Sequence, residues 1–450
     1  MAAYYLILSG LVLCGLCLCT IKRSRLLDGI FLFISFGVLA TMSAIRYDVG
    51  FDYSFVYAPI YYRMINDATG ELIAQSRWEP GFKLLLRGLM LVSDNFQMIF
   101  VVTSILIVFL VMLFFWMYSP NPLISVFLFV TLSHFYCSMN FVRQTLAAAI
   151  AMFTLPLLKK FIEKMHKKEI AGSLPFAAGY FAVVMIAASF HMSALLLAPF
   201  FFVNLIPINK YVLSIYAVIA TAIYFNTHAI LEFITRFWYQ WYPLDSIHMQ
   251  AAFSLQFTIA AAMVFLVIFL GSDALSEKDS GNRLYINYAF FGAFFILMGT
   301  RHSVIDRLSL PFILLAPVGI SIVITELYKR LKEEWEEWSR KKNVAFLAVS
   351  LFAVVGGGLS IHHYALTMDH HGVVPYQIVF NQPFYREYVE HLRRRRAGLI
   401  IFEEPPIGPE FIDLPPIADI PRPQMPDTDV MGENGPVEVT LEEFLDLLDD

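Results

Sequence analysis

Twelve apolar runs, each close in length to a membrane-spanning helix, constrain this chain more than any other feature. They cover residues 4–19, 27–45, 96–117, 122–138, 141–157, 172–190, 193–207, 211–226, 251–270, 284–300, 308–325 and 343–361. A helix needs about 20 apolar residues to cross the hydrocarbon core of a bilayer. The chain is 58% hydrophobic and only 15% charged, whereas about 25% of the residues in a soluble protein are charged. The sequence therefore predicts an all-α, polytopic integral membrane protein with about 12 transmembrane helices.

Basic residues predict the orientation of these helices. The first apolar run precedes Lys22, Arg23 and Arg25, whereas a cleavable signal peptide carries its positive charges before its apolar core. Loops rich in Lys and Arg stay in the cytoplasm, so we expect the first helix to run inwards. Threading twelve helices from there places the basic segments 158–171 and 328–342 inside and both termini outside.

Arginine and lysine divide unequally between the two sides of this topology. The cytoplasmic loops hold 12 Lys and 5 Arg, whereas the external segments before residue 362 hold 8 Arg and one Lys, Lys83. Positive-inside sorting acts on both residue types, so the external arginines need another explanation. A guanidinium stays charged when partly desolvated and binds phosphate through two parallel hydrogen bonds. The alternative is that external Arg pairs with external Asp and Glu and fixes the loops.

The last 51 residues have a different composition. Residues 400–450 contain 14 acidic residues, nine prolines and one arginine, a composition that cannot bury a core. We therefore divide the chain into a transmembrane domain, 1–399, and an acidic, Pro-rich tail, 400–450, that we expect to be disordered. Thr440 and Glu443 have capping-box spacing ahead of a short apolar stripe. That stripe is suited to docking on a partner, and an idle tail is the alternative.

No pattern in the sequence predicts a metal ion or a cofactor. Cys14, Cys17 and Cys19 lie in the first apolar run and Cys137 in the fourth, so no CxxC pair stands in a loop. The adjacent His370 and His371 have no third ligand at a suitable spacing. Gly-rich nucleotide loops, HExxH and Gly-x-Ser-x-Gly are absent from the sequence, which gives nucleotide use and common hydrolase chemistry no support.

Two motifs lie between the second and third apolar runs, on the side assigned to the outside. The first, RYDVGFDY (46–53), contains Arg46, Asp48 and Asp52. A helical turn here would put both aspartates on one face near Arg46, and Gly50 permits a bend. The second, RWEPGFKLLLRGLM (77–90), includes Arg77, Glu79 and Pro80, and proline suits the first turn of a helix. Its apolar residues indicate a short helix lying in the membrane interface.

The motif NFVRQTLAAAIAMF (140–153) begins the fifth apolar run. Asn140, Arg143 and Gln144 have i, i+3, i+4 spacing, which predicts a shared helix face. The alanines that follow allow a neighbouring helix to approach closely. Arg143 should thus lie against protein rather than lipid, where a charge is costly and usually functional.

Three more motifs follow at the external ends of later runs. SFHMSAL (189–195) contains His191, which is either a proton acceptor with a near-neutral pKa or a buried structural histidine. GTRHSVIDRLSLPF (299–312) contains Arg301, Asp306 and Arg307, a set with a positive surplus that could hold an anion. GVVPYQIVF (372–380) contains Tyr376 and follows the last run.

These motifs, in this order and on one side of the membrane, resemble the EpsG family of polysaccharide polymerases, which is related to the Wzy polymerases. The resemblance covers about residues 40–380 and leaves out the acidic tail. It implies a glycosyltransferase-C-like fold and a metal-independent glycosyltransferase at the outer face of the bacterial plasma membrane. The implied substrates are oligosaccharide repeat units on undecaprenyl pyrophosphate, for exopolysaccharide, capsule or O-antigen synthesis. A chain-length regulator and other membrane proteins of polysaccharide assembly are the implied partners.

This function assigns a role to each candidate residue. Asp52, Glu79 and His191 are candidates for the base that activates an acceptor hydroxyl. The expected pyrophosphate- and glycan-binding residues are Arg46, Asp48, Arg77, Asn140, Arg143, Gln144, Arg301, Asp306, Arg307 and Tyr376. Arginines in this position would stabilise the charge that develops on a leaving pyrophosphate, so no metal is required.

Three other functions remain open at this point. A glycan ligase would use the same lipid-linked donor and the same arginines, and only its acceptor differs. A flippase or transporter should show inverted repeats and charges near the bilayer midplane, whereas the charges here gather at external helix ends. A membrane acyltransferase would also need an acyl-donor site.

Overall fold

The computed structural model describes residues 1–19, 24–67, 70–76, 78–237, 255–333 and 337–381. In these residues the regular structure is helical, apart from one isolated antiparallel bridge between Arg46 and Ile378. The all-α prediction is confirmed. Arg77 and the acidic tail, with the predicted domain boundary at 399–400, lie outside the described residues.

Six described helices are long and apolar enough to cross a membrane, and each coincides with an apolar run of the sequence. They are α1 (Ala2–Cys19), α2 (Arg25–Ala44), α6 (Gln97–Tyr118), the continuous pair α9 (Val142–Ala151) and α10 (Thr154–His166), α11 (Ile170–Ala188), and the Arg340–Thr367 helix. The last comprises most of α20 (Glu337–Phe352), the π-helical η6 (Ala353–Gly357) and α21 (Gly358–Thr367). The chain is therefore a multi-pass membrane protein.

Three other apolar runs form helix pairs that bend by more than 40°. They are α7 (Pro122–Thr131) with α8 (His134–Asn140), α13 (Lys210–Phe225) with α14 (Thr227–Phe237), and η5 (Ser303–Ser309) and α18 (Leu310–Ile313) with α19 (Ala316–Glu333). In the first pair Ser133 has a φ of 66°, a left-handed conformation that a right-handed helix cannot continue through. Counting each pair as one span raises the number of candidate spans in the described chain to nine.

The three remaining apolar runs, 193–207, 251–270 and 284–300, form helices that are short. They correspond to η2 (Met192–Leu196) with α12 (Leu197–Val203), to α15 (Leu255–Leu270) and to α17 (Leu284–Gly299). A helix of 16 residues is about 24 Å long, against about 30 Å of hydrocarbon. All twelve runs therefore contain helix, whereas twelve full crossings and a glycosyltransferase-C-like architecture stay predictions.

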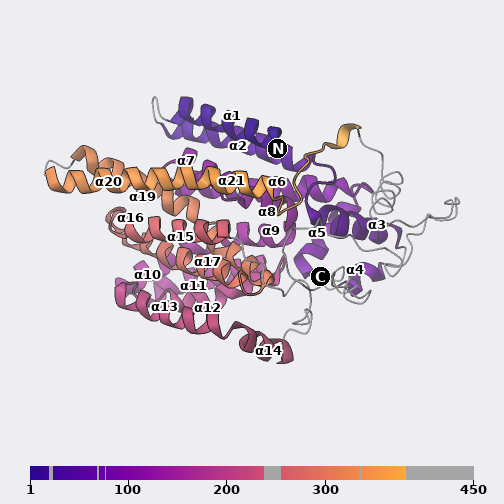
Figure 1. Cartoon of the computed structure of the whole chain (residues 1–450). Helices are drawn as coiled ribbons and strands as arrows, with labels where there is room; N and C mark the ends of the chain where they lie inside the picture. The colour runs from indigo at the N-terminus through magenta and orange to yellow at the C-terminus, as the bar shows by residue number, and fades with distance from the viewer. Residues whose placement is uncertain (20–23, 68–69, 77, 238–254, 334–336, 382–450) are drawn as a thin grey trace, which may run out of the picture.

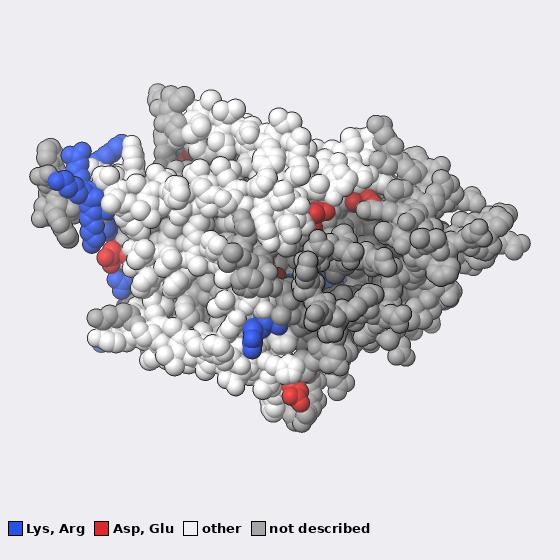
Figure 2. All heavy atoms as spheres, in the orientation of Figure 1, with Lys and Arg blue, Asp and Glu red and all other residues white. Residues whose placement is uncertain are grey.

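The two ends of the helix bundle differ in composition. At one end the α6–α7 turn meets α19, where Ser321 Oγ donates to the Asn121 carbonyl at 3.0 Å. At the same end Lys159 of α10 forms an ion pair with Asp279 at 2.6 Å. Asp279 is the residue between α16 (Ser272–Lys278) and η4 (Ser280–Arg283). Figure 2 shows Lys and Arg gathered where α19 and α20 meet, with a broad uncharged band beside them.

The opposite end carries the short elements of the sequence motifs (Figure 1). These are the π-helical η1 (Tyr53–Tyr57), α3 (Ala58–Asn66), α4 (Glu71–Gln75), α5 (Pro80–Met90) and η7 (Val379–Asn381). The helix predicted within 77–90 is confirmed as α5, and Pro80 is its first residue. A proline fits there because the first-turn N–H has no partner within the helix.

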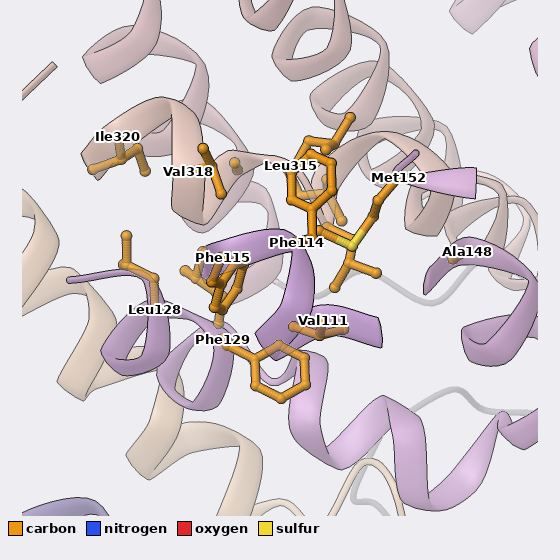
Figure 3. Close-up of a cluster of buried hydrophobic side chains, with 14 of the residues drawn as sticks. Val111, Phe114, Phe115, Leu128, Phe129, Ala148, Met152, Leu315, Val318 and Ile320 are labelled. Carbon is orange, nitrogen blue, oxygen red and sulfur yellow. The ribbon is translucent and has the colours of Figure 1, made fainter. Parts of the chain in front are cut away.

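The core places α9 at the centre of the bundle. Figure 3 shows buried side chains that lie in or directly beside α6, α7, α9 and α19 and pack together. They are Val111, Phe114, Phe115, Leu128, Phe129, Ala148, Met152, Leu315, Val318 and Ile320. The small alanines of α9 are buried and allow it to pack against α6, α11 and α18. Arg143, in the first turn of α9, has a side chain only 13% exposed. The prediction that Arg143 lies against other helices is confirmed.

Candidate active site

Five segments that are distant in the sequence meet at the motif-bearing end of the bundle. They are 50–57, 78–82, 140–144, 191–193 and 303–309, and hydrogen bonds join them. Gln144 Nε2, on α9, donates to the Arg307 carbonyl of η5 at 2.8 Å. Gly81 N, on α5, donates to the Ser189 carbonyl at 2.6 Å, just before the His191 turn. Five of the six sequence motifs therefore contribute to one cluster.

Asp52 lies in the middle of this cluster. Its backbone N–H donates to Asn140 Oδ1 at 3.1 Å, and the π-helical turn η1 begins at the next residue. Its half-buried carboxylate forms no hydrogen bond or ion pair with any residue that the structure describes. Burial raises the pKa of this carboxyl to about 6, although the positive charges of Arg307 and Arg143 oppose the increase. A carboxylate with a near-neutral pKa is well suited to act as a general base.

Arg307 contributes a positive charge that no carboxylate neutralises directly. Its guanidinium lies over the Phe141 ring, 4.5 Å from the centroid. Within the described ranges no Asp or Glu lies at ion-pair distance from it. The group is half-buried, and its charge lowers the pKa of Asp52 and of His191. Arg307 can therefore bind an anion without first breaking an ion pair.

Arg143 is held more tightly. Its Nη1 donates to Glu79 Oε2 at 3.0 Å, its backbone N–H donates to Tyr57 Oη at 3.3 Å, and its guanidinium lies 5.3 Å from the Trp78 ring centroid. The other oxygen of Glu79 accepts a hydrogen bond from Met192 N at 3.0 Å. Because both Glu79 oxygens are engaged, Glu79 orients Arg143 and is a poor candidate for the base.

His191 is a neutral hydrogen-bond donor in this environment. The Ser193 backbone N–H donates to His191 Nδ1 at 3.2 Å, so Nδ1 carries no proton and Nε2 does. Burial, with the nearby charges of Arg143 and Arg307, lowers the pKa of the imidazole to about 3. The sequence left open whether His191 is a proton acceptor with a near-neutral pKa or a buried structural histidine. The first role does not fit this geometry.

Two predictions of a shared helix face are wrong: the one for Asp48 and Asp52, and the one for Asn140 and Arg143. Asp48 has a φ of 52° and Gly50 a φ of 94°, so no helical turn places Asp48 and Asp52 on one face; the bend that Gly50 permits is formed instead. Asn140 ends α8, and α9 begins at Val142. Asn140 and Arg143 therefore do not share a helix face, and the break lets Asn140 turn toward Asp52.

Arg46 is buried away from this cluster. It is 0% exposed, and its Nη1 donates to the Ser43 carbonyl, to Ser43 Oγ and, at 2.9 Å, to Ser104 Oγ. Its guanidinium lies 4.8 Å from the Phe100 ring centroid. Burial lowers the pKa of Arg46 to about 10, so the group stays charged. A guanidinium enclosed in this way cannot reach a ligand, and we therefore leave Arg46 out of the site.

We expect Arg46→Ala to reduce folding and leave the chemistry intact. The change empties a buried space and removes three hydrogen bonds, which should destabilise the protein by about 2–5 kcal/mol. Activity per folded molecule should stay within about two-fold because the group touches no substrate. Heating followed by size-exclusion chromatography measures the loss, and Arg46→Met, which fills most of the space, is the matched variant. A folded Arg46→Met protein without activity would return Arg46 to the site.

Two other predicted site residues, Arg301 and Tyr376, also lie apart from the cluster, whereas Asp306 lies within its 303–309 segment. Arg301 is exposed and lies 5.3 Å from the Tyr224 ring centroid on α13. Tyr376 donates its hydroxyl to the Met42 carbonyl at 2.8 Å. Asp306 precedes Arg307 in η5 and is exposed, and a side chain at Gly299 would meet its Cβ at 2.6 Å.

Sequence reasoning missed four residues that support the cluster. Tyr57, Trp78 and Phe141 provide the aromatic surroundings of the two arginines, and Ser193 fixes the His191 ring. Trp78 and Phe141 are sequence neighbours of Glu79 and Asn140, so aromatic residues beside polar motifs were the available signal. Tyr57 had none, because only the π-helical turn brings it back to Arg143.

Comparison with known protein families gives one match. The EpsG family model matches residues 29–378, a range that contains all five segments of the cluster. No curated protein and no solved structure gives a match. The chain belongs to the EpsG family.

Proposed function

We propose that this protein polymerises oligosaccharide repeat units carried on undecaprenyl pyrophosphate. The observation that carries the proposal is the pair Arg143 and Arg307 beside Asp52, a carboxylate with no partner among the described residues and a pKa raised to about 6. The EpsG family is associated with polysaccharide polymerisation, and this cluster has the charges that such a transfer needs.

The proposed reaction forms one glycosidic bond and breaks one sugar–phosphate bond. Asp52 takes the proton of an acceptor sugar hydroxyl while the hydroxyl oxygen attacks the anomeric carbon of the donor. The bond from that carbon to the pyrophosphate breaks, and the pyrophosphate leaves with the bonding electrons. Asp52 then releases its proton to water. This assignment makes Asp52 the base, in preference to Glu79 and His191.

The arginines act on the leaving group. Negative charge increases on the pyrophosphate as its bond to the sugar lengthens, so nearby guanidinium groups stabilise the transition state more than the ground state. Glu79 offsets the charge of Arg143, whereas Arg307 contributes a full positive charge. The neutral His191 ring can donate a further hydrogen bond from Nε2 to a phosphate oxygen. These groups would supply the positive charge without a metal ion.

The same proposal places the site on the outer face of the bacterial plasma membrane. The cluster lies at the end of the bundle opposite the basic cluster of α19 and α20 (Figures 1 and 2). Cytoplasmic loops are enriched in Lys and Arg, so the basic end would face the cytoplasm.

Cysteine labelling tests this orientation. In a background without the native cysteines, we expect Asp67→Cys at the end of α3 to react with an impermeant thiol reagent on intact cells. Met165→Cys, at an exposed position of α10, should react only after the membrane is permeabilised. The reverse pattern would place the cluster in the cytoplasm and contradict the proposed orientation.

Glycan analysis of a deletion strain tests the proposed function. Without this protein we expect the polymer to disappear while single repeat units remain on the lipid carrier or on their acceptor. A ligase gives a different result, because the polymer would still form and would remain on the lipid. Normal polymer in the deletion strain would contradict the proposal.

A further inference from the structure

The last sequence motif is joined to the first by backbone hydrogen bonds. Tyr47 N donates to the Gln377 carbonyl at 3.0 Å, and Val379 N donates to the Ile45 carbonyl at 2.9 Å. The bridge between Arg46 and Ile378 lies between these two bonds. The segment 369–379 thus lies against the chain that leads directly to Asp52.

Close packing continues this contact up to Asp52. Gly50 N donates to the Gly372 carbonyl at 2.7 Å. A Cβ on Gly372 would lie 2.9 Å from Phe51 N, and a Cβ on Gly50 would lie 2.3 Å from the Met139 carbonyl oxygen. Real Cβ atoms do not tolerate such contacts, and both glycines have positive φ values, 64° and 94°. Segments 49–52, 139–140 and 372 therefore have little freedom to move relative to one another.

His371 lies next to Gly372 and contacts the other side of the cluster. Its side chain is buried, and its ring packs edge-to-face on Phe141, with centroids 5.7 Å apart and planes at 88°. Phe141 is the ring over which the Arg307 guanidinium lies. His371 Nε2 is 3.5 Å from Cys137 Sγ on α8. The order of contacts is therefore His371, Phe141, Arg307.

We propose that His371 is a positioning residue for the transfer reaction, holding Phe141 and, through it, the Arg307 guanidinium beside Asp52. This inference rests on the proposed function. We assign His371 no direct contact with substrate, because its buried ring contacts Phe141 and Cys137. Burial lowers the pKa of His371 to about 3, with smaller contributions from His370, Arg307 and His134. The ring is therefore neutral and adds no second cation behind Arg307.

The adjacent histidine provides a matched control. His370 is half-buried and packs on Phe257 and Tyr364, with centroid distances of 5.2 and 5.1 Å, on the side of α15 and α21. Purified full-length variants in proteoliposomes with lipid-linked repeat units would be compared by initial rate. We expect His371→Ala to lower kcat by about 10- to 100-fold, since a misplacement of about 1 Å can have this effect, with a smaller change in KM. His370→Ala should change kcat by less than about two-fold.

A second variant separates positioning from general damage. If His371 acts through Arg307, His371→Ala should have much less effect in an Arg307→Lys protein than in the wild type, whereas independent effects multiply. With Arg143→Lys, the effect of His371→Ala should be close to its full size. A kcat for His371→Ala equal to that of His370→Ala, or full multiplication with Arg307→Lys, would overturn the inference.

The outcomes distinguish the two proposals. If Arg307→Lys and Asp52→Asn lose activity while His371→Ala keeps it, only the role of His371 is wrong. If folded Arg307→Lys and Asp52→Asn proteins both retain wild-type rates, the proposed site is wrong. Should His371→Ala fail to fold, Phe141→Leu removes the ring that contacts both His371 and Arg307, and a normal kcat in that variant overturns the inference.

Discussion

Asp52→Asn is expected to lower the rate of polymerisation per folded protein by about 10²- to 10⁴-fold, the usual range for loss of a general base. Asparagine has nearly the same size and keeps the backbone N–H that bonds Asn140, so the cluster should keep its shape. What is lost is the carboxylate that takes the proton of the acceptor hydroxyl. Asp52→Glu keeps a carboxylate and should retain more activity than Asn.

The same base predicts the pH dependence of the wild-type rate. Asp52 must be ionised to accept a proton, and its pKa is raised to about 6, so the rate should fall as the pH decreases through about 6 and level off above it. Arg307 lowers this pKa. Its removal should therefore raise the pKa of Asp52 and move the midpoint of the profile to higher pH. An Asn variant with the wild-type rate and pH profile would exclude Asp52 as the base.

Arg307→Ala should lower the rate by about 10²- to 10³-fold, the effect typical of removing one group that stabilises a developing anion. Lysine keeps the charge but not the planar fork, so Arg307→Lys should lose about 10- to 100-fold, and Arg143→Lys likewise. Rates need to be expressed per folded protein, particularly for Arg143, because its removal also leaves Glu79 without its ion pair.

Arg301→Ala is the matched control for these variants. Arg301 lies just before the same 3-10 helix as Arg307, but it is exposed and contacts Tyr224. Its replacement should have less than about a three-fold effect on the rate. Equal losses for Arg301→Ala and Arg307→Ala would mean that net positive charge at this end matters and the position of Arg307 does not. For Arg143, the alternative is that its ion pair with Glu79 is only structural. In that case Arg143→Lys would be nearly as active as the wild type.

Apolar periodicity and residue type were sufficient to predict much of the fold. All twelve apolar runs contain helix, and α5 begins at Pro80 as its sequence requires. The motifs that contain Asp52, Glu79 and Arg143 were also recognisable, because charged residues in or beside apolar runs are rare and usually functional. Each of these signals is local, so a single segment is sufficient to reveal it.

The remainder depends on contacts between distant segments, which local patterns do not encode. Arg46 directly follows an apolar run and Arg307 directly precedes one. Arg46 is nevertheless enclosed by Ser43, Ser104 and Phe100, whereas Arg307 lies on Phe141. The break between α8 and α9 interrupts the motif NFVRQTLAAAIAMF, which reads as one continuous helix in the sequence. The role inferred for His371 requires contacts with Cys137 and Phe141, more than 200 positions earlier in the chain.

Reconstitution tests the central claim most directly. The purified full chain would be placed in proteoliposomes with undecaprenyl-pyrophosphate-linked repeat units as the only substrate, and glycan length and released undecaprenyl pyrophosphate would be measured together. We predict a ladder of longer glycans with one undecaprenyl pyrophosphate released per bond formed, and neither product with Asp52→Asn or Arg307→Ala of equal folded amount. Chain extension by the Asp52→Asn protein at the wild-type rate, or no extension by a folded wild-type protein, would contradict the account.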